Sequence, residues 1–258
     1  MKRALISGAS SGIGEAFTLA LVQEGYDCVV FARRESNLQD LKQRCEKIRE
    51  NSCSYLVLDA REENTMDILE NVIQDKQWTF DLVINNAGFG YIGDFKDMKE
   101  STIHDMIEVN VNFLTRLTYR MIPYMNQGGI FLQVSSLAGS MSGPYMNVYY
   151  ATKNYVSAFS LACDIEFKSL GLRSLAFIPG PVHTEFGQVA KAGSLPIFKT
   201  IKSQDVTQAV KFALKGIQKR QRFIVSQPIH RVLLWCVKWL PQSWVAHIVA
   251  NLQKKRTQ

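Results

Sequence analysis

A tyrosine and a lysine four positions apart could supply acid–base chemistry at neutral pH. Tyr149 and Lys153 fall in a stretch of helical period, so both side chains should lie on one face of a helix. A phenol with a pKa of about 10 is a poor proton donor and acceptor at neutral pH, but a neighbouring ammonium favours the phenolate and lowers that pKa. Tyr150 lacks the four-residue spacing, which makes Tyr149 the candidate acid and base. The same pair is also common on purely structural helices.

Two polar residues upstream could complete such a site. Ser136 follows Ile130–Val134, an apolar run typical of a buried strand, and its hydroxyl could hold a substrate oxygen by a hydrogen bond. Asn110 lies inside a predicted helix over 103–126. Each residue by itself also has an ordinary structural explanation.

A glycine-rich turn directly follows the first predicted strand, Ala4–Ser7. Gly8, Gly12 and Gly14 form a GxxxGxG spacing that opens a predicted helix over Gly12–Glu24. Glycines in this position let the backbone turn sharply and let a pyrophosphate approach the amides of a helix N-terminus. The turn therefore favours a nucleotide site, with an ordinary strand–helix turn as the alternative.

Two arginines end the second predicted strand, Cys28–Ala32. A site for NAD usually places a carboxylate on the ribose hydroxyls here, whereas a site for NADP places a guanidinium on the 2′-phosphate. Ala32 occupies the position expected for the carboxylate and Arg33 follows it, so the sequence favours NADP. The alternatives are a solvated arginine pair and neutralisation of Arg34 by Glu35.

Further polar residues end the third and fourth predicted strands, Tyr55–Leu58 and Leu82–Ile84. Asp59 follows the first of these strands, and Asn85-Asn86-Ala87-Gly88 follows the second. Ligands in parallel sheets lie at the carboxyl ends of the strands. Asparagines here could also bridge strand ends or cap local backbone groups.

The alternation of strands and helices predicts one doubly wound α/β domain. Further strands are expected at Ile130–Val134, Ser174–Ile178 and Arg222–Val225, and helices near 62–76, 103–126, 149–170 and 203–218. Continuous apolar strands separated by helices predict a parallel sheet of about seven strands with helices on both faces. We expect this Rossmann-like domain over 1–227 and a short helical appendix over 228–258.

Taken together, these residues resemble the short-chain dehydrogenase/reductase family in its single-domain branch. The matching motifs run from Ser7 to Thr184, in the family's order and spacing. They are the GxxxGxG turn, Asp59, the NNAG run at 85–88, Asn110 in EVNV, Ser136 in VSS, Tyr149-x-x-x-Lys153, and Pro179-Gly180-Pro181-Val182-His183-Thr184. The resemblance implies a Rossmann-like fold and reversible hydride transfer between a nicotinamide and an alcohol/carbonyl pair.

The resemblance also implies a role for each residue. Tyr149 would protonate the carbonyl oxygen, Lys153 would bind the nicotinamide ribose and lower the Tyr149 pKa, Ser136 would steady the oxygen, and Asn110 would help to hold a water. The expected cofactor-binding residues are Gly8, Ser10, Gly12, Ile13, Gly14, Arg33, Arg34, Asp59, Asn86, Ala87, Gly88, Tyr149, Lys153, Pro179, Gly180, Val182 and Thr184.

Two features bear on cofactor and substrate. Many NADP-preferring members carry a basic residue before the second glycine of the turn, where this chain has Ser11, so the choice of cofactor depends on Arg33 with help from Arg34. The segment from His183 to Ser203 occupies the family's variable substrate loop. Its mixed apolar composition suggests a medium-sized hydrophobic ketone or aldehyde, although its residues could equally pack on the body.

Composition and charge exclude several other classes of protein. The chain has 258 residues, 47% of them hydrophobic, and a formal net charge of +7. No acidic residue follows Asp205, so the positive excess lies entirely in the C-terminal part and gives no reason to expect nucleic-acid binding. The five cysteines contain no CxxC pair, so we expect neither a disulfide framework nor a metal site. Their pattern suits a reducing compartment, and we expect a cytoplasmic protein without a signal peptide.

The appendix over 228–258 leaves three alternatives open. It carries three tryptophans and a basic end, and its apolar stretch Val232–Leu240 is too short to span a bilayer. Such a segment could form a lid over the substrate pocket, a subunit contact, or a peripheral contact with an anionic membrane. The resemblance implies a homodimer or homotetramer formed through the long helices near 103–126 and 149–170.

The sequence as a whole predicts an NADP(H)-dependent oxidoreductase that reduces a hydrophobic carbonyl to an alcohol. One alternative is a non-catalytic NADP-binding sensor or scaffold. Another is an NAD-dependent alcohol dehydrogenase.

Overall fold

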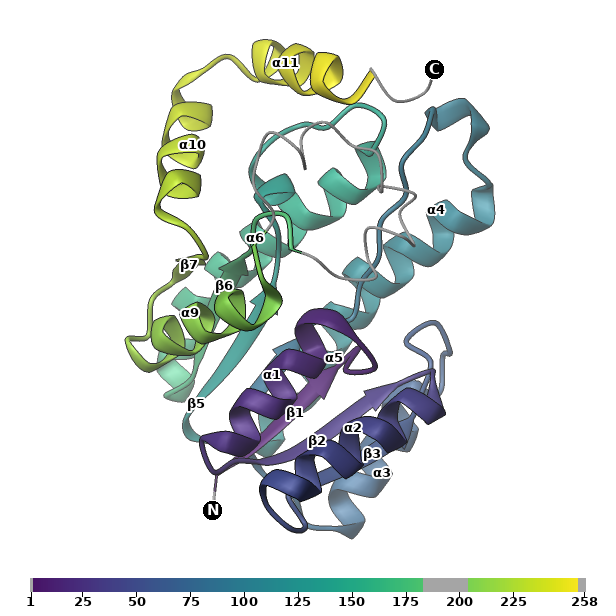
Figure 1. The fold of residues 1–258 in the computed structure, drawn as a ribbon, viewed down its shortest axis with the longest axis vertical. Coiled ribbons are helices and arrows are strands. Elements are labelled where there is room, and N and C mark those ends of the chain that lie inside the picture. The colour runs from purple at the N-terminus through teal and green to yellow at the C-terminus, as the bar shows by residue number, and fades with distance from the viewer. Residues whose placement is uncertain (1, 183–203, 255–258) are drawn as a thin grey trace.

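The computed structural model describes residues 2–182 and 204–254, built around a seven-stranded parallel sheet (Figure 1). The strand order is β3-β2-β1-β4-β5-β6-β7. Their bounds are β1 Arg3–Ser7, β2 Asp27–Ala32, β3 Cys53–Val57, β4 Phe80–Asn85, β5 Met125–Val134, β6 Arg173–Ile178 and β7 Phe223–Val225. The order reverses between β1 and β4, where sheets of this kind open onto a ligand. The predicted doubly wound fold is confirmed.

Helices cover both faces of the sheet, because its central strands are apolar on both sides. They are α1 Gly12–Gln23, α2 Glu35–Ile48, α3 Thr65–Asp75, α4 Glu100–Ile107, α5 Leu114–Met121, α6 Asn147–Glu166, α9 Val206–Gln218, α10 Pro228–Trp239 and α11 Gln242–Lys254. In Figure 1, α1, α2 and α9 lie on the near side of the sheet, where Phe17 and Leu41 belong to one buried cluster. Helices α3, α5 and α6 cover the other face, where Leu69 and Leu117 belong to a second cluster.

The helix predicted over 103–126 is wrong at its end and interrupted in its middle. Between α4 and α5 the chain forms a π-helical turn, Glu108–Phe113, that contains Asn110. After α5 the chain forms a short 3-10 turn that contains Pro123, and β5 already begins at Met125. The helix stops early because a proline can neither donate the helical hydrogen bond nor avoid the preceding carbonyl.

The C-terminal appendix is helical, as predicted: α10 packs on the segment after β5 and on β7, and α11 is bonded to α6 through Gln253 and Tyr150. Val237 of α10 and Val245 and Val249 of α11 are buried in a cluster with Tyr149 and Tyr150. Figure 1 shows these two yellow helices at the end of the molecule opposite the N-terminus. Within the described ranges no helix combines the length and the apolar character needed to cross a bilayer.

A buried carboxylate joins α6 to the last two strands. Asp164 is fully buried, and its oxygens accept from Arg173 Nε at 2.6 Å, from Arg222 Nε at 2.9 Å and from the Ser174 amide at 3.2 Å. Burial raises the pKa of this carboxyl, but the hydrogen bonds from Arg173, Arg222 and Ser174 outweigh it and leave the pKa below its usual range.

Replacing Asp164 with Asn should lower the free energy of unfolding by about 3 kcal/mol, because two guanidinium groups lose their charged partner. Since the pKa of Asp164 is lowered in the folded chain, its stabilisation is present above about pH 4 and fades as the pH falls further. Urea unfolding at neutral and at acid pH should therefore show a smaller difference between Asp164→Asn and the native chain in acid.

The matched control is Asp67→Asn, which removes an ion pair with Arg120 whose aspartate is 64% exposed. It should change the stability by less than about 1 kcal/mol. Equal losses in the two variants would contradict the role assigned to burial.

Candidate functional site

The carboxyl ends of β1 and β4 are tied together by Ser7 and Asn86. Ser7 Oγ accepts hydrogen bonds from the Asn86 amide at 2.9 Å and the Ala87 amide at 3.0 Å. Asn86 Nδ2 donates to the carbonyls of Ser7 and Gly8, both at 3.0 Å. The segment 85–88 at the end of β4 is therefore hydrogen-bonded to the start of the glycine-rich turn and holds it in place.

Two glycines allow this close approach. At Gly8, whose φ is +65°, a Cβ would stand 2.8 Å from the Ala87 Cα, and at Gly14 it would stand 2.5 Å from the Gly8 carbonyl oxygen and 2.6 Å from Asn86 Nδ2. Real Cβ atoms do not come this near to backbone. The glycine spacing thus follows from the packing of the turn against the neighbouring strand end.

The N-terminus of α1 suits the pyrophosphate of a dinucleotide. Ser11 stands at the N-cap of α1 but makes no side-chain capping bond; its Oγ instead accepts from Arg34 Nη2 at 2.7 Å. Arg34 Nη2 also donates to Ser10 Oγ at 3.1 Å. The first-turn amides of a helix carry partial positive charge, and here no serine side chain occupies them.

Arg33 and Asp59 lie near each other beyond the ends of β2 and β3. Arg33 Nη1 is 3.9 Å from Asp59 Oδ2, and the Arg33 side chain is 61% exposed. Asp59 is bound more closely by Arg61 Nη2, at 2.6 Å, and Arg61 Nη1 in turn reaches Asp105 Oδ2 at 2.9 Å. Burial raises the pKa of Asp59, but its bonds to Arg61 outweigh this and lower it. Sequence reasoning missed Arg61, because nothing local links it to Asp105.

The π-helical turn aims Asn110 at the segment that follows β4. Its Oδ1 accepts from the Phe89 amide at 3.0 Å, and its Nδ2 donates to the Phe89 carbonyl at 2.9 Å and to Thr152 Oγ1 at 3.0 Å. Such single wide turns are frequent at functional sites because they re-aim a side chain. Asn110 thereby joins the end of β4 to α6.

Lys153 is buried beside Asn110. Its Nζ donates to the Val134 carbonyl at 2.8 Å, and a Cβ at Gly88 would lie 3.4 Å from Nζ and 2.9 Å from Asn110 Oδ1. Burial lowers the pKa of Lys153 to about 8. The ammonium thus lies between the ends of β4 and β5, on the side of α6 that faces the sheet.

Tyr149 shares the buried side of α6 with Lys153. Its hydroxyl is hydrogen-bonded to the Ser136 side chain, and Lys153 Nζ is 5.9 Å from the centre of its ring. Burial raises the pKa of Tyr149 to about 12, opposed by the hydrogen bond from Ser136. The sequence led us to expect a pKa lowered by Lys153, but in the chain by itself burial raises it and only the Ser136 hydrogen bond opposes the rise, so the phenol is neutral at physiological pH.

Two further residues, Asn154 and Ser135, hold the segment after β5 against α6. Asn154 Nδ2 donates to the carbonyls of Ala138 and Met141, both at 3.0 Å, and Ser135 Oγ donates to the Lys153 carbonyl at 3.0 Å. The bridging role of Asn154 could be predicted from the sequence only by its place next to Lys153 in a helix with a buried face. These contacts fix the place of Ser136 relative to Tyr149.

The remaining predicted residues lie at the end of β6. The Pro179 carbonyl accepts from the Leu137 amide at 3.2 Å, and the Gly180 amide donates to Ser226 Oγ at 3.2 Å. Val182 forms an isolated bridge with Gln204. Thr184 and the proposed substrate loop from His183 to Ser203 lie outside the described residues.

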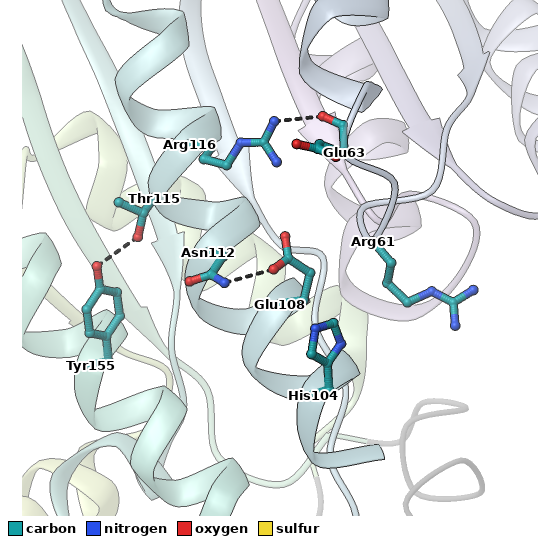
Figure 2. A pocket seen from close by; sticks show the side chains of 8 residues that line it. All are labelled: Arg61, Glu63, His104, Glu108, Asn112, Thr115, Arg116 and Tyr155. Atoms are coloured by element: carbon teal, nitrogen blue, oxygen red, sulfur yellow. Dashed lines mark hydrogen bonds between the residues drawn. The ribbon is translucent and has the colours of Figure 1, made fainter. Parts of the chain in front are cut away.

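A surface hollow lies on the outer side of α4, α5 and α6, and none of the predicted site residues lines it. Figure 2 shows polar side chains around it, among them Arg61, His104, Arg116 and Tyr155. Tyr155 is linked to Thr115 by a hydrogen bond of 2.8 Å between their hydroxyl oxygens. This hollow is separate from the cluster around Tyr149.

Comparison with known proteins shows the family and the fold to which the chain is similar. The family model described as short chain dehydrogenase matches residues 2–194. A 3-oxoacyl-[acyl-carrier-protein] reductase of Thermotoga maritima is 28% identical over 82% of this chain and 89% of its own. A short-chain dehydrogenase from Sphingobium yanoikuyae, solved in complex with NADPH, has a TM-score of 0.82 and 26% identity, covering 92% of each chain. One from Burkholderia phymatum in complex with NAD has the same TM-score at 19% identity, covering 90% of this chain and 91% of its own.

A parallel sheet with a glycine-rich turn at its switch point is the arrangement that binds dinucleotides in Rossmann-like folds. The chain belongs to the short-chain dehydrogenase family. It is therefore an enzyme that acts on CH–OH groups of small molecules with a nicotinamide cofactor.

Replacing Gly14 with Ala should weaken cofactor binding roughly tenfold, because the new methyl group must push back the Gly8 carbonyl and Asn86. The dissociation constant for NADPH, measured by its fluorescence, reports the effect. Gly25→Ala is the control: nothing lies within 4 Å of its Cβ, and its φ is +86°. That variant should lose about 1 kcal/mol of stability and keep its affinity. A Gly14→Ala chain with native affinity would disprove the packing argument.

Proposed function

We propose that the protein is an NADPH-dependent reductase that converts a medium-sized hydrophobic ketone or aldehyde into an alcohol. The observation that carries the proposal is the arrangement on α6: a neutral, buried Tyr149 bonded to Ser136, with the Lys153 ammonium on the same side of the helix.

The catalytic roles follow from these groups. The bound cofactor supplies a hydride to the carbonyl carbon. Ser136 and Tyr149 hold the carbonyl oxygen by hydrogen bonds, and the Tyr149 hydroxyl gives its proton to that oxygen as negative charge develops there. The Lys153 ammonium stabilises the phenolate that remains until a solvent proton restores it. Asn110 keeps the end of β4 in place through its bonds to Phe89.

The raised pKa of Tyr149 suits its role as proton donor. A phenol with a pKa of about 12 is protonated at neutral pH and ready to donate to the carbonyl oxygen.

The arginines at the end of β2 support a preference for NADPH. Arg33 is mostly exposed, and its ion pair with Asp59 is long, at 3.9 Å. Its side chain can therefore turn toward a 2′-phosphate at little cost in free energy. Arg34 already borders the glycine-rich turn through Ser10 and Ser11. The Sphingobium relative binds NADPH, whereas the Burkholderia protein binds NAD. An NAD-dependent alcohol dehydrogenase is therefore the enzymatic alternative.

An apolar surrounding supports a hydrophobic substrate. Tyr149 belongs to a cluster with Met106, Met141, Met146 and the valines of α10 and α11. The Thermotoga relative is named for a 3-oxoacyl substrate, which also carries a ketone on an apolar chain. A non-catalytic NADP sensor or scaffold would not require Ser136, Tyr149 and Lys153 in one place.

The outer surfaces of α5 and α6 support the proposed homodimer or homotetramer. Tyr119 and Ile165 are large apolar side chains exposed on these helices. A cytoplasmic location stays a prediction from the cysteine pattern.

Replacing Tyr149 with Phe should lower kcat by at least about 100-fold, because the proton donor is removed, while the affinity for NADPH is kept. NADPH oxidation with a panel of hydrophobic ketones measures the rate. Tyr150→Phe is the matched control, since that neighbouring hydroxyl bonds to Gln253 of α11. Full activity of Tyr149→Phe would refute the mechanism.

Replacing Arg33 with Ala should weaken NADPH binding about tenfold, as expected for the loss of one charge-assisted hydrogen bond, and leave NADH binding unchanged. Isothermal titration with both cofactors tests this. If the native chain shows no preference for NADPH, the NAD-dependent alternative replaces our proposal.

A further inference from the structure

The helices α10 and α11 have two apolar sides, and only one of them is covered. Val237, Val245 and Val249 are buried against the cluster that contains Tyr149 and Tyr150. Gln253 Nε2 also donates to the Tyr150 hydroxyl at 3.1 Å, which fixes the end of α11 on α6. This side accounts for the attachment of the two helices to the body.

Outside this covered side the two helices expose six large apolar residues, which we call the tryptophan face: Ile229, Val232, Trp235 and Trp239 of α10 and Trp244 and Ile248 of α11. The exposed fractions of its tryptophans are 65% for Trp235, 73% for Trp239 and 64% for Trp244. On α10 the spacing of three, three and four residues places the exposed side chains on one stripe. Exposed apolar patches of this kind mark surfaces that bind a partner or a membrane.

The segment that carries the tryptophan face bears charge of a single sign. Residues 228–258 contain Arg231, Lys238, Lys254, Lys255 and Arg256 and no aspartate or glutamate. Arg231 and Lys238 are exposed and seven residues apart, so they lie along one edge of α10, between its buried and exposed sides. The occupant of this face should therefore be both apolar and negatively charged.

Neither helix is long and apolar enough to cross a bilayer, and the same holds for every helix in the described ranges. Tryptophan is the side chain best suited to the boundary between lipid headgroups and acyl chains, and basic residues at that depth meet anionic headgroups. The family match ends at residue 194, so both helices lie beyond the part shared with the family model.

We propose that α10 and α11 lie in the plane of an anionic lipid bilayer, with the tryptophan face inserted among the headgroups. The opposite side of the same helices covers the Tyr149 cluster, so this contact brings the substrate side of the enzyme next to the membrane surface. The proposed membrane contact is inferred from the exposed residues and their charge, and it does not depend on which carbonyl compound the enzyme reduces.

The test is flotation of the intact chain with vesicles of phosphatidylcholine alone and with vesicles that also contain phosphatidylglycerol. We expect the protein to float with the anionic vesicles and to be released by high salt. The triple variant Trp235→Ser, Trp239→Ser, Trp244→Ser should lose at least about tenfold in binding. Lys238→Ala should lose roughly fivefold on anionic vesicles only.

Matched controls separate this surface from general changes. Phe95→Ser removes an aromatic side chain between β4 and α4 that is 56% exposed, and Lys215→Ala removes an exposed charge on α9. Both should float like the native chain. Quenching by brominated lipids adds a direct reading, since three of the four tryptophans lie on the tryptophan face.

Three results would overturn the proposal. The first is failure of the native chain to float with anionic vesicles, and the second is equal flotation of the triple tryptophan variant. The third is a change of oligomeric state in the triple variant with vesicle binding unaltered, which would assign the tryptophan face to a second copy of this chain. Turnover with NADPH is measured on the same samples, so loss of membrane binding and loss of catalysis are read separately.

Discussion

The burial of one ammonium group determines how the catalytic half of this protein is assembled. Lys153 can stay in the interior because the Val134 carbonyl, at the end of β5, accepts a hydrogen bond from its Nζ. The backbone around it is held as well, since Ser135 donates to the Lys153 carbonyl. Helix α6 is thereby pressed onto β5 in one register, which places Tyr149 against Ser136.

The same packing logic joins the cofactor half to the catalytic half. Gly88 leaves room for both Lys153 and Asn110, and two positions earlier Asn86 supports the turn formed by Gly8 and Gly14. A short segment after β4 therefore touches the nucleotide turn on one side and the proton-donating side chains on the other. Small residues are needed along it because backbone and polar groups from four elements meet there.

Basic residues of the body and basic residues of α10 and α11 differ in whether they have acidic partners. In the body, most arginines are paired with carboxylates, as Arg61 is with Asp59 and Asp105, and Arg173 with Asp164. In α10 and α11 the basic residues have no acidic neighbour in the sequence. The positive charge of the whole chain thus has little to do with its catalytic domain and accompanies the exposed tryptophans instead.

The sequence by itself determined the fold class and which side chains share a face, because strand and helix periods and the i, i+4 spacing of Tyr149 and Lys153 are local properties. Tertiary structure decided the wide turn at Asn110, the early end of the helix before β5, and the partners of Arg61 and Asn154. It also decided the sign of the Tyr149 pKa shift, since burial depends on packing from distant elements. Spacing alone could not tell which side of α10 is covered, because both sides are apolar and only the position of β7 and of the segment after β5 distinguishes them.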